Sequence, residues 1–284
     1  MTTRRHIILG YPESGKTTYL AALWHVIDAG LVGTSLVLEK TSGDAEYLNK
    51  IVEAWLRCEE VPRTYISNEE HVALHVRDTR TQATMVLTLP DFSGETFQEI
   101  FADRQCAEEF VENANATGGI LFFVNADRAD DMTSVLDHVF EDDEDAGGGN
   151  DTGSEEPTEY DARKTPEQTR IVELLQILQV RPFDRRHRRL VIAISAWDVV
   201  QDDGVSPAEW IAREMPLLEQ FLRNNSEIYD VRFCGISAQG GMLNGDSRSS
   251  LLEKKPAERV ICHWQGKLGP DITQPLRWLG ADDE

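Results

Sequence analysis

Residues 5–17 read RHIILGYPESGKT, a short apolar run followed by a glycine-rich loop. The run has the length and composition of a buried strand, and apolar residues recur at helical spacing from Thr17 to Ala29. The loop between them, Gly10 to Thr17, has the form G-x-x-x-x-G-K-[ST]. Because this motif binds phosphate when it connects a strand to a helix, the stretch predicts a phosphate-binding loop.

The residue types in this loop suit a nucleoside triphosphate. Glycines let backbone N–H groups curl around phosphates, and the start of the following helix adds partial positive charge. We expect Lys16 to neutralise the β- and γ-phosphates and the Thr17 hydroxyl to bind Mg²⁺. The expected nucleotide contacts are Gly10, Glu13, Ser14, Gly15, Lys16, Thr17 and the following Thr18.

The rest of the chain alternates between strand and helix patterns. Further strands are expected at 35–38, 71–76, 83–89, 119–124, 190–194 and 231–236, and helices at about 45–56, 98–112, 166–179, 207–223 and 271–279. Two of the strands, 71–76 and 83–89, form a hairpin. The pattern predicts a three-layer α/β fold with a mainly parallel sheet, one antiparallel hairpin strand and helices on both faces. We expect a single domain over residues 1–284.

Composition excludes several classes of protein. The chain has 28 Lys and Arg against 50 Asp and Glu, a net charge of −22, and 40% apolar residues. No run reaches the roughly 18 to 20 apolar residues of a membrane span, and the first residues are too short in apolar length for a secretory signal. The negative charge repels phosphate backbones. We therefore expect a cytoplasmic protein without nucleic-acid partners, and its four separated cysteines fit reduced thiols.

Charge is concentrated in two segments. Residues 141–161 contain ten acidic residues, no Lys or Arg, and almost nothing apolar. Such a segment cannot bury enough surface to offset the entropy of ordering, so 141–163 is interpreted as a mobile acidic insert. Residues 181–189 contain five arginines. They form either a solvated loop or a site for an acidic partner, the insert included.

A second motif, Asp91-Phe92-Ser93-Gly94, follows the second hairpin strand. An acid at the carboxyl end of a strand faces the crevice in which open α/β sheets bind ligands. We expect Asp91 to hold Mg²⁺ through water and the Gly94 N–H to reach the γ-phosphate.

Two further segments complete a recognisable order. Ser195-Ala196-Trp197-Asp198 follows strand 190–194, and Ser237-Ala238 follows strand 231–236. With the phosphate loop and D-x-x-G, this order resembles the Ras-like GTPases of the P-loop class (TRAFAC-type). The resemblance implies that Asp198 accepts hydrogen bonds from guanine N1 and N2, and that the Ala238 N–H, next to Ser237, meets O6. Ala196 replaces the lysine that packs over the base in that family, which leaves an ATPase open.

The resemblance also implies a switch threonine and a water-positioning residue. Thr64 is expected to contact Mg²⁺ and the γ-phosphate, after an additional helix that makes this segment longer than in small GTPases. Glu95 stands where Ras-like members have glutamine, and repulsion between its carboxylate and the γ-phosphate predicts slow hydrolysis without a partner. The expected catalytic residues are Lys16, Thr64, Gly94 and Glu95, and the expected metal ligands are Thr17, Thr64 and Asp91.

Smaller features resemble one branch, the bacterial double-GTPases of conflict and defence operons. They are Trp55 with the P-R-T of 62–64, the Gly94-Glu95 pair, the Ala196 to Asp198 variant and the segment 275–279. The resemblance implies GTP or GDP and Mg²⁺ as ligands, a switch with slow GTP hydrolysis, and a protein effector or activating partner. A non-hydrolysing nucleotide-binding adaptor, motivated by Glu95, is the alternative from another class.

Overall fold

The computed structural model describes residues 4–30, 33–43, 45–62, 72–89, 100, 104–127, 165–201 and 204–281. Its strands are β1 (Arg4–Gly10), β2 (Leu36–Ser42), β3 (Val72–Asp78), β4 (Thr84–Leu89), β5 (Gly119–Asn125), β6 (Arg188–Ser195), β7 (Tyr229–Ser237), β8 (Ile261–Trp264) and β9 (Lys267–Gly269). Its helices are α1 (Lys16–Ala29), α2 (Ala45–Leu56), α4 (Glu108–Ala116), α6 (Glu167–Ile177), the 3₁₀ turn η3 (Trp197–Val199), α7 (Pro207–Glu214), α8 (Pro216–Asn224), α9 (Gly245–Glu253), α10 (Pro256–Arg259) and α11 (Gln274–Gly280).

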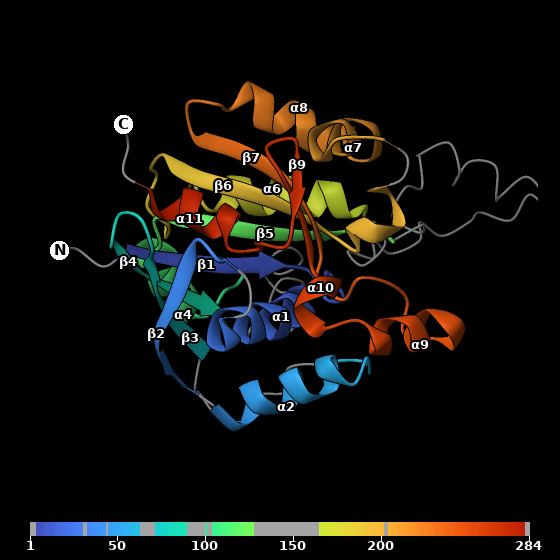
Figure 1. Ribbon diagram of the computed structural model, residues 1–284. Helices are drawn as coiled ribbons and strands as arrows, with labels where there is room; N and C mark the ends of the chain where they lie inside the picture. Colours follow the sequence, from blue (N-terminus) through green and yellow to red (C-terminus); the bar gives the residue numbers. More distant parts are fainter. Residues whose placement is uncertain are drawn as a thin grey trace, which may run out of the picture.

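The strands form one nine-stranded sheet in the order β2-β3-β4-β1-β5-β6-β7-β8-β9 (Figure 1). Strands β4, β1, β5, β6 and β7 are parallel to one another. Their carboxyl ends therefore meet at one edge of the sheet, as in other open α/β sheets that bind ligands there. The predicted α/β fold with a mainly parallel central sheet is confirmed.

Both faces of the sheet are buried because apolar residues point alternately to each side of every central strand. On β1, Ile7 and Leu9 pack in one cluster with α4, α6, α7 and α8, while Ile8 packs in the other cluster with α1, α2 and α11. The five consecutive residues of β5 from Ile120 to Val124 divide between the two clusters in the same alternating way. The continuous apolar runs thus reflect helices on both faces.

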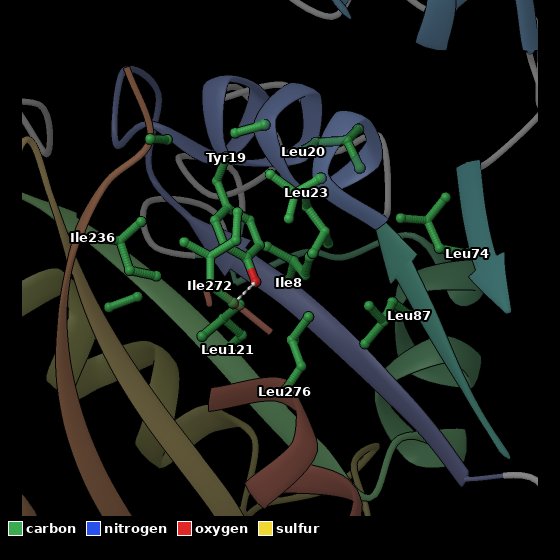
Figure 2. Packing of buried hydrophobic residues seen from close by; sticks show 14 of the residues in the cluster. Ile8, Tyr19, Leu20, Leu23, Leu74, Leu87, Leu121, Ile236, Ile272 and Leu276 are labelled. Carbon is green, nitrogen blue, oxygen red and sulfur yellow. Dashed lines mark hydrogen bonds between the residues drawn. The ribbon is translucent and has the colours of Figure 1, made fainter. Parts of the chain in front are cut away.

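Figure 2 shows the cluster beneath α1, in which Ile8, Leu20, Leu23 and Leu121 lie side by side. The hydroxyl of Tyr19, in the first turn of α1, donates a 3.0 Å hydrogen bond to the carbonyl of Ile272. This bond lies in a fully buried setting and ties the helix that follows the phosphate loop to the C-terminal segment.

Antiparallel pairing is more extensive than predicted. The hairpin β3–β4 is present, but β2 also pairs antiparallel with β3, and β8 and β9 extend the other side of the sheet in antiparallel fashion. The prediction of one antiparallel hairpin strand was therefore wrong for the sheet edges. Strands β8 and β9 have only four and three residues, too few for a period-two pattern to be read.

Two predicted helices differ from the observed ones. The helix expected at 207–223 is divided into α7 and α8, because Pro216 has no N–H to continue the ladder and Met215 leaves the helical conformation. The helix expected at 98–112 is interrupted at 104–107, where Arg104 has a φ of +57°, and α4 begins at Glu108. The acidic insert predicted at 141–163 lies outside the described residues.

The arginine-rich segment 181–189 is solvated only in part: Arg181 and Arg185 are exposed, whereas the later arginines bind the rest of the structure. Arg186 donates to the carbonyls of Ala114, Asn115 and Thr117 at the end of α4. Arg188 is buried and donates to the Leu178 carbonyl. These cations occupy the negative ends of helices, where carbonyls lack intrahelical partners.

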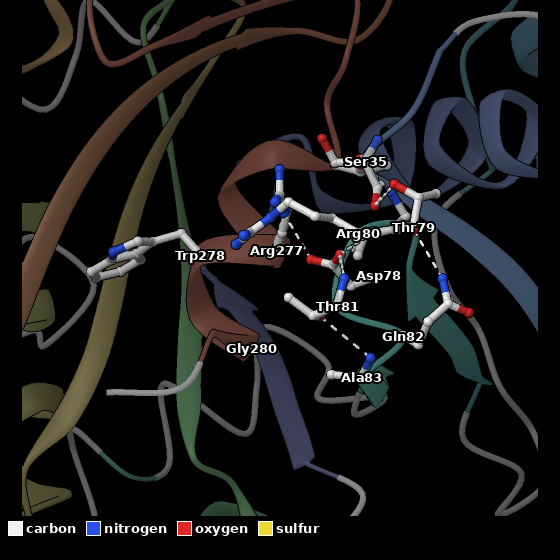
Figure 3. Close-up of polar contacts among 12 residues, drawn as sticks. Ser35, Asp78, Thr79, Arg80, Thr81, Gln82, Ala83, Arg277, Trp278 and Gly280 are labelled. Carbon is white, nitrogen blue, oxygen red and sulfur yellow. Dashed lines mark hydrogen bonds and ion pairs between the residues drawn. The ribbon is translucent and has the colours of Figure 1, made fainter. Parts of the chain in front are cut away.

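The β3–β4 turn lies at the amino end of β1, opposite the phosphate loop. Figure 3 shows Asp78 at the start of this turn, bonded to the amides of Arg80 and Thr81 and to Arg277 of α11, whose Nε lies 2.7 Å from the carboxylate. Burial alone would raise the pKa of Asp78, but these three partners outweigh it and lower the pKa below its ordinary value. The pair of Asp78 with Arg277 fastens α11 to the hairpin.

A buried histidine should make stability depend on pH. His6 of β1 is 1% exposed, and burial, followed by the charges of Arg4 and Arg189, lowers its pKa to about 4. Between pH 6.5 and 4 the unfolded chain therefore binds a proton that the folded chain does not, and stability falls as the pH falls. We expect this residue to remove about 3 kcal/mol from the free energy of unfolding over that range.

The comparison of wild type with His6→Leu isolates this contribution, since all other titrating groups are shared. Urea unfolding measured at about pH 7, 6, 5 and 4 should show a steeper loss in the wild type than in the variant. Parallel curves for the two proteins over this range would contradict the prediction.

Candidate functional site

The loop between β1 and α1 is folded around the side chain of Lys16. Its Nζ lies 2.5 Å from the Gly10 carbonyl, 2.8 Å from the Tyr11 carbonyl and 3.3 Å from the Ser14 hydroxyl. The ammonium group thus donates to three oxygens of the loop. It is held within the turn that the sequence motif predicts, where it can exchange these oxygens for those of a phosphate.

The start of α1 suits the binding of an anion. Its N-cap is Gly15, which has a φ of +87° and supplies no side-chain cap, and the first turn contains no acidic residue. The first amides of a helix have no intrahelical acceptors and point toward this end, which suits a phosphate. The described residues of the loop therefore fit a phosphate group.

Two glycines in the loop are required by close packing. A Cβ at Gly10 would lie 2.7 Å from the Phe123 carbonyl, and a Cβ at Gly15 would lie 2.7 Å from the Ser195 Cβ. The loop therefore lies directly against β5 and the end of β6. This contact brings the phosphate loop next to the first residue of the predicted base-reading segment.

Asn125 is a site residue that the sequence analysis missed. It ends β5, and its Nδ2 donates a 3.0 Å hydrogen bond to the Glu13 carbonyl, while its Oδ1 accepts from the Asp127 amide at 3.0 Å. Glu13 has a φ of +64°, a conformation that non-glycine residues rarely adopt. Asn125 thus fixes the middle of the phosphate loop. The available signal was a polar residue at the carboxyl end of the most apolar strand.

Asp198 and Ser237 are brought together as the sequence order predicts. The Ser237 hydroxyl donates a hydrogen bond to Asp198 Oδ1 and accepts one from the Gly240 amide at 3.0 Å. Ser237 is fully buried, whereas Asp198 is partly exposed. The bond orients the carboxylate and leaves its second oxygen for another donor. Ala196, in the lysine position, adopts the left-handed conformation with a φ of +51°.

Trp197 fills the space behind this carboxylate, which gives a testable packing constraint. Its indole is fully buried, and a Cβ at Gly235 of β7 would lie 2.2 Å from its Cδ2 atom. We expect Gly235→Ala to lower the free energy of unfolding by about 1 to 3 kcal/mol through overpacking. It should also weaken nucleotide binding, since Asp198 follows the displaced indole directly.

Urea unfolding and nucleotide titration test this expectation, with Gly269→Ala as the matched control. A Cβ at Gly269 meets nothing within 4 Å, so the control should behave as wild type. Equal stability and affinity in the Gly235→Ala variant would contradict the packing argument.

The catalytic and metal residues are described only in part. Lys16 and Thr17 lie in the first turn of α1, whereas Thr64, Asp91, Gly94 and Glu95 lie outside the described residues. The described part of the chain contains no group of three or more His, Cys, Asp or Glu that could hold a metal ion. Strand β4, which precedes Asp91, runs parallel to β1 and ends at the same edge as Gly10.

A cavity of about 420 Å³ in the described structure lies away from the phosphate loop. It is bounded by the β3–β4 turn, the β8–β9 hairpin and α11, and its lining includes Arg80, Trp264, Lys267 and Arg277. The β3–β4 turn is at the amino end of β1, so this cavity is on the opposite edge of the sheet from the phosphate loop. It takes no part in the site described above.

The sheet and the phosphate loop together are those of a P-loop nucleotide-binding protein. The chain belongs to the Double-GTPase 1 family, which it matches over residues 7–279. The resemblance to double-GTPases that the sequence motifs carry is thereby confirmed. The family relation supports a guanine nucleotide as the ligand of this site.

Several solved structures are distantly similar. The G domain of the T. maritima FeoB iron transporter has 10% identity and a TM-score of 0.34, with 89% of this chain and 98% of that chain covered. The S. cerevisiae Ski7 GTPase-like domain, bound to GTP, has 14% identity and a TM-score of 0.43, with 86% of this chain and 45% of that chain covered. A chain of the signal recognition particle receptor SRb-GTP/SRX complex from Chaetomium thermophilum has 14% identity and a TM-score of 0.40, with 88% and 96% covered. No curated protein matches the chain.

Within the ranges that the structure describes, no helix is both long enough and apolar enough to cross a membrane.

Proposed function

We propose that this chain is a cytoplasmic GTP-binding switch that takes up GTP with Mg²⁺, hydrolyses it slowly and acts as a single domain over residues 1–284. One observation carries the proposal: the phosphate loop and the pair Asp198–Ser237 lie at neighbouring strand ends on one edge of the sheet. The contact of Gly15 with Ser195 joins these two parts. A nucleotide whose phosphates lie on the loop would therefore present its base to Asp198.

Each described residue has a defined task in this proposal. Lys16 exchanges loop oxygens for phosphate oxygens, and the first amides of α1 add further donors. Asp198, oriented by Ser237, accepts hydrogen bonds from guanine N1 and N2, and the Ala238 N–H donates to O6. Asn125 supports the loop through Glu13. Charged hydrogen bonds of this kind contribute about 1.5 to 3 kcal/mol each, enough to favour guanine even with alanine at position 196.

Magnesium would neutralise phosphate charge in this site and would be held by Thr17 with Thr64 and Asp91. We place Gly94 at the γ-phosphate and Glu95 beside the attacking water. A carboxylate there is repelled by the phosphate, so turnover should be slow until a protein partner completes the site. The resemblance to double-GTPases of conflict and defence operons supports a bacterial defence role in which an effector protein responds to the GTP-bound form.

Equilibrium titration of fluorescent GTP, GDP and ATP, with Mg²⁺ and with EDTA, tests the ligand. We expect GTP and GDP to bind more tightly than ATP, and GTP affinity to fall when Mg²⁺ is removed. Single-turnover phosphate release then tests the reaction. Tight GTP binding without release, even with cell extract added, would favour the adaptor; stronger ATP binding would favour an ATPase.

A further inference from the structure

The carboxyl end of α2 is bonded to the last residue of β7 and the loop that follows it, here together called the base loop (residues 237–241). Trp55 is fully buried, and its Nε1 donates a 2.8 Å hydrogen bond to the Ala238 carbonyl. In return, the Gln239 Nε2 donates to the Trp55 carbonyl at 3.4 Å. These bonds join residues 183 and 184 positions apart in the chain.

Two arginines beyond the base loop bind the same end of α2. Arg259, 4% exposed, donates to the Leu56 carbonyl at 3.3 Å and to the Cys58 Sγ at 3.0 Å. Arg248 donates to the carbonyls of Arg57 and Cys58 at 3.1 and 2.8 Å. The last carbonyls of a helix have no intrahelical donor and carry partial negative charge, so both cations suit this position.

The base loop also packs against the chain that carries Arg259. A Cβ at Gly240 would lie 2.4 Å from the Arg259 carbonyl oxygen, and Gly240 has a φ of +86°. The Arg259 guanidinium lies 5.9 Å from the centre of the Trp55 ring, within reach of a cation–π contact. Trp55, the base loop and Arg259 therefore form one closely packed unit.

The base loop is thus restrained from three sides. Asp198 holds the Ser237 side chain, Trp55 holds the Ala238 carbonyl, and the backbone at Arg259 limits Gly240. Of these, only the Trp55 bond acts on the residue whose N–H is assigned to guanine O6. Removal of that bond frees the torsions of Ala238 without touching Asp198.

We infer that Trp55 is a positioning residue for base recognition, and that α2, the additional helix of this chain, supports the base loop. This inference rests on the proposed function for the identity of the base. Because coupling between two sites is reciprocal, a base bound at Ala238 stabilises the contact with α2 by the same factor that the contact favours the base.

Trp55→Phe tests the inference because it keeps an aromatic ring and removes the donor. Affinities are measured for GTP, for 6-thio-GTP, which differs only at O6, and for ITP, which lacks the 2-amino group that Asp198 is assigned to bind. We expect the preference for GTP over 6-thio-GTP to fall by about five- to tenfold, which is the change in relative affinity that the loss of one hydrogen bond produces. The preference for GTP over ITP should stay within about twofold of wild type.

Trp264→Phe is the matched control, since this indole is also buried and packs against Trp278, away from the base loop. It should leave both ratios unchanged. Equal ratios in wild type and Trp55→Phe, or equal losses in both tryptophan variants, would overturn the inference. Arg248→Ala, a change at a partly exposed residue, provides a second route and should shift the 6-thio-GTP ratio in the same direction as Trp55→Phe.

A readout without nucleotide separates this inference from the proposed function. Amide hydrogen exchange of residues 237–241 should be faster in nucleotide-free Trp55→Phe than in wild type, and unchanged in Trp264→Phe. If the wild type shows no guanine preference but exchange responds to Trp55, the base assignment fails and the support of the loop stands. If exchange does not respond, the inference fails whatever the nucleotide.

Discussion

Lys16→Ala is expected to reduce the affinity for GTP by at least about 100-fold. The substitution removes the only side-chain cation held within the described phosphate loop, and a lysine there donates to two phosphates. Two charge-assisted hydrogen bonds of about 1.5 to 3 kcal/mol each correspond to a loss of that size or more. Titration with fluorescent GTP measures the effect directly.

The control for Lys16→Ala is Lys40→Ala, which removes an equal charge from the exposed edge strand β2. It should leave GTP affinity within about twofold of wild type, because exposed charges at a distance are screened by salt. Thermal unfolding of Lys16→Ala must be followed as well, since the ammonium also bonds Gly10 and Tyr11. GTP affinity within about tenfold of wild type in a folded variant would refute the role of Lys16.

The central strands could be predicted because burial on both faces leaves an unmistakable sequence pattern. β5 contains ILFFV at 120–124, and its two faces divide between the two core clusters. β6 follows the same rule with LVIAI at 190–194, whereas the exposed Arg232 interrupts the apolar run of β7. A continuous apolar run of this length, placed between helical patterns, indicates a strand that is covered on both faces.

The sheet edges and the α7–α8 break were less predictable because local signals there are short. β9 has three residues, and its pairing with β8 depends on a turn in which Gln265 and Gly266 have positive φ. Pro216 follows a strong capping box at Ser206, so the helical pattern continues through a point where the ladder must break. Such outcomes depend on tertiary packing more than on local preference.

The site was predicted where motif and strand end coincide, and missed where a contact comes from far along the chain. Lys16, Asp198 and Ser237 are each marked by a motif. Asn125 and Trp55 donate hydrogen bonds to the backbone carbonyls of Glu13 and Ala238. Because every residue has such a carbonyl, the sequence does not indicate which one a distant side chain will bind. In the sequence, Trp55 stands out only as a family feature, without a role.

Asp198→Asn is expected to change the base preference of the protein from guanine to xanthine. The carboxylate of Asp198 accepts from N1 and N2 in the proposed function, whereas the amide nitrogen of an asparagine would face the 2-amino donor with its own N–H groups. Xanthine has a carbonyl in place of the 2-amino group and can accept from that amide. The Ser237 hydroxyl can still donate to the asparagine Oδ1, so the orientation of the side chain should persist.

We expect GTP affinity to fall on the order of 100-fold in Asp198→Asn and XTP affinity to rise by a similar factor, since two charged hydrogen bonds are involved. Asp246→Asn, at an exposed acid on α9, removes the same charge and should change neither value. Competition of GTP, XTP and ATP against one fluorescent nucleotide gives all three affinities. ATP binding as tight as GTP binding in the wild type, unchanged in Asp198→Asn, would mean that Asp198 supports the turn and does not read the base.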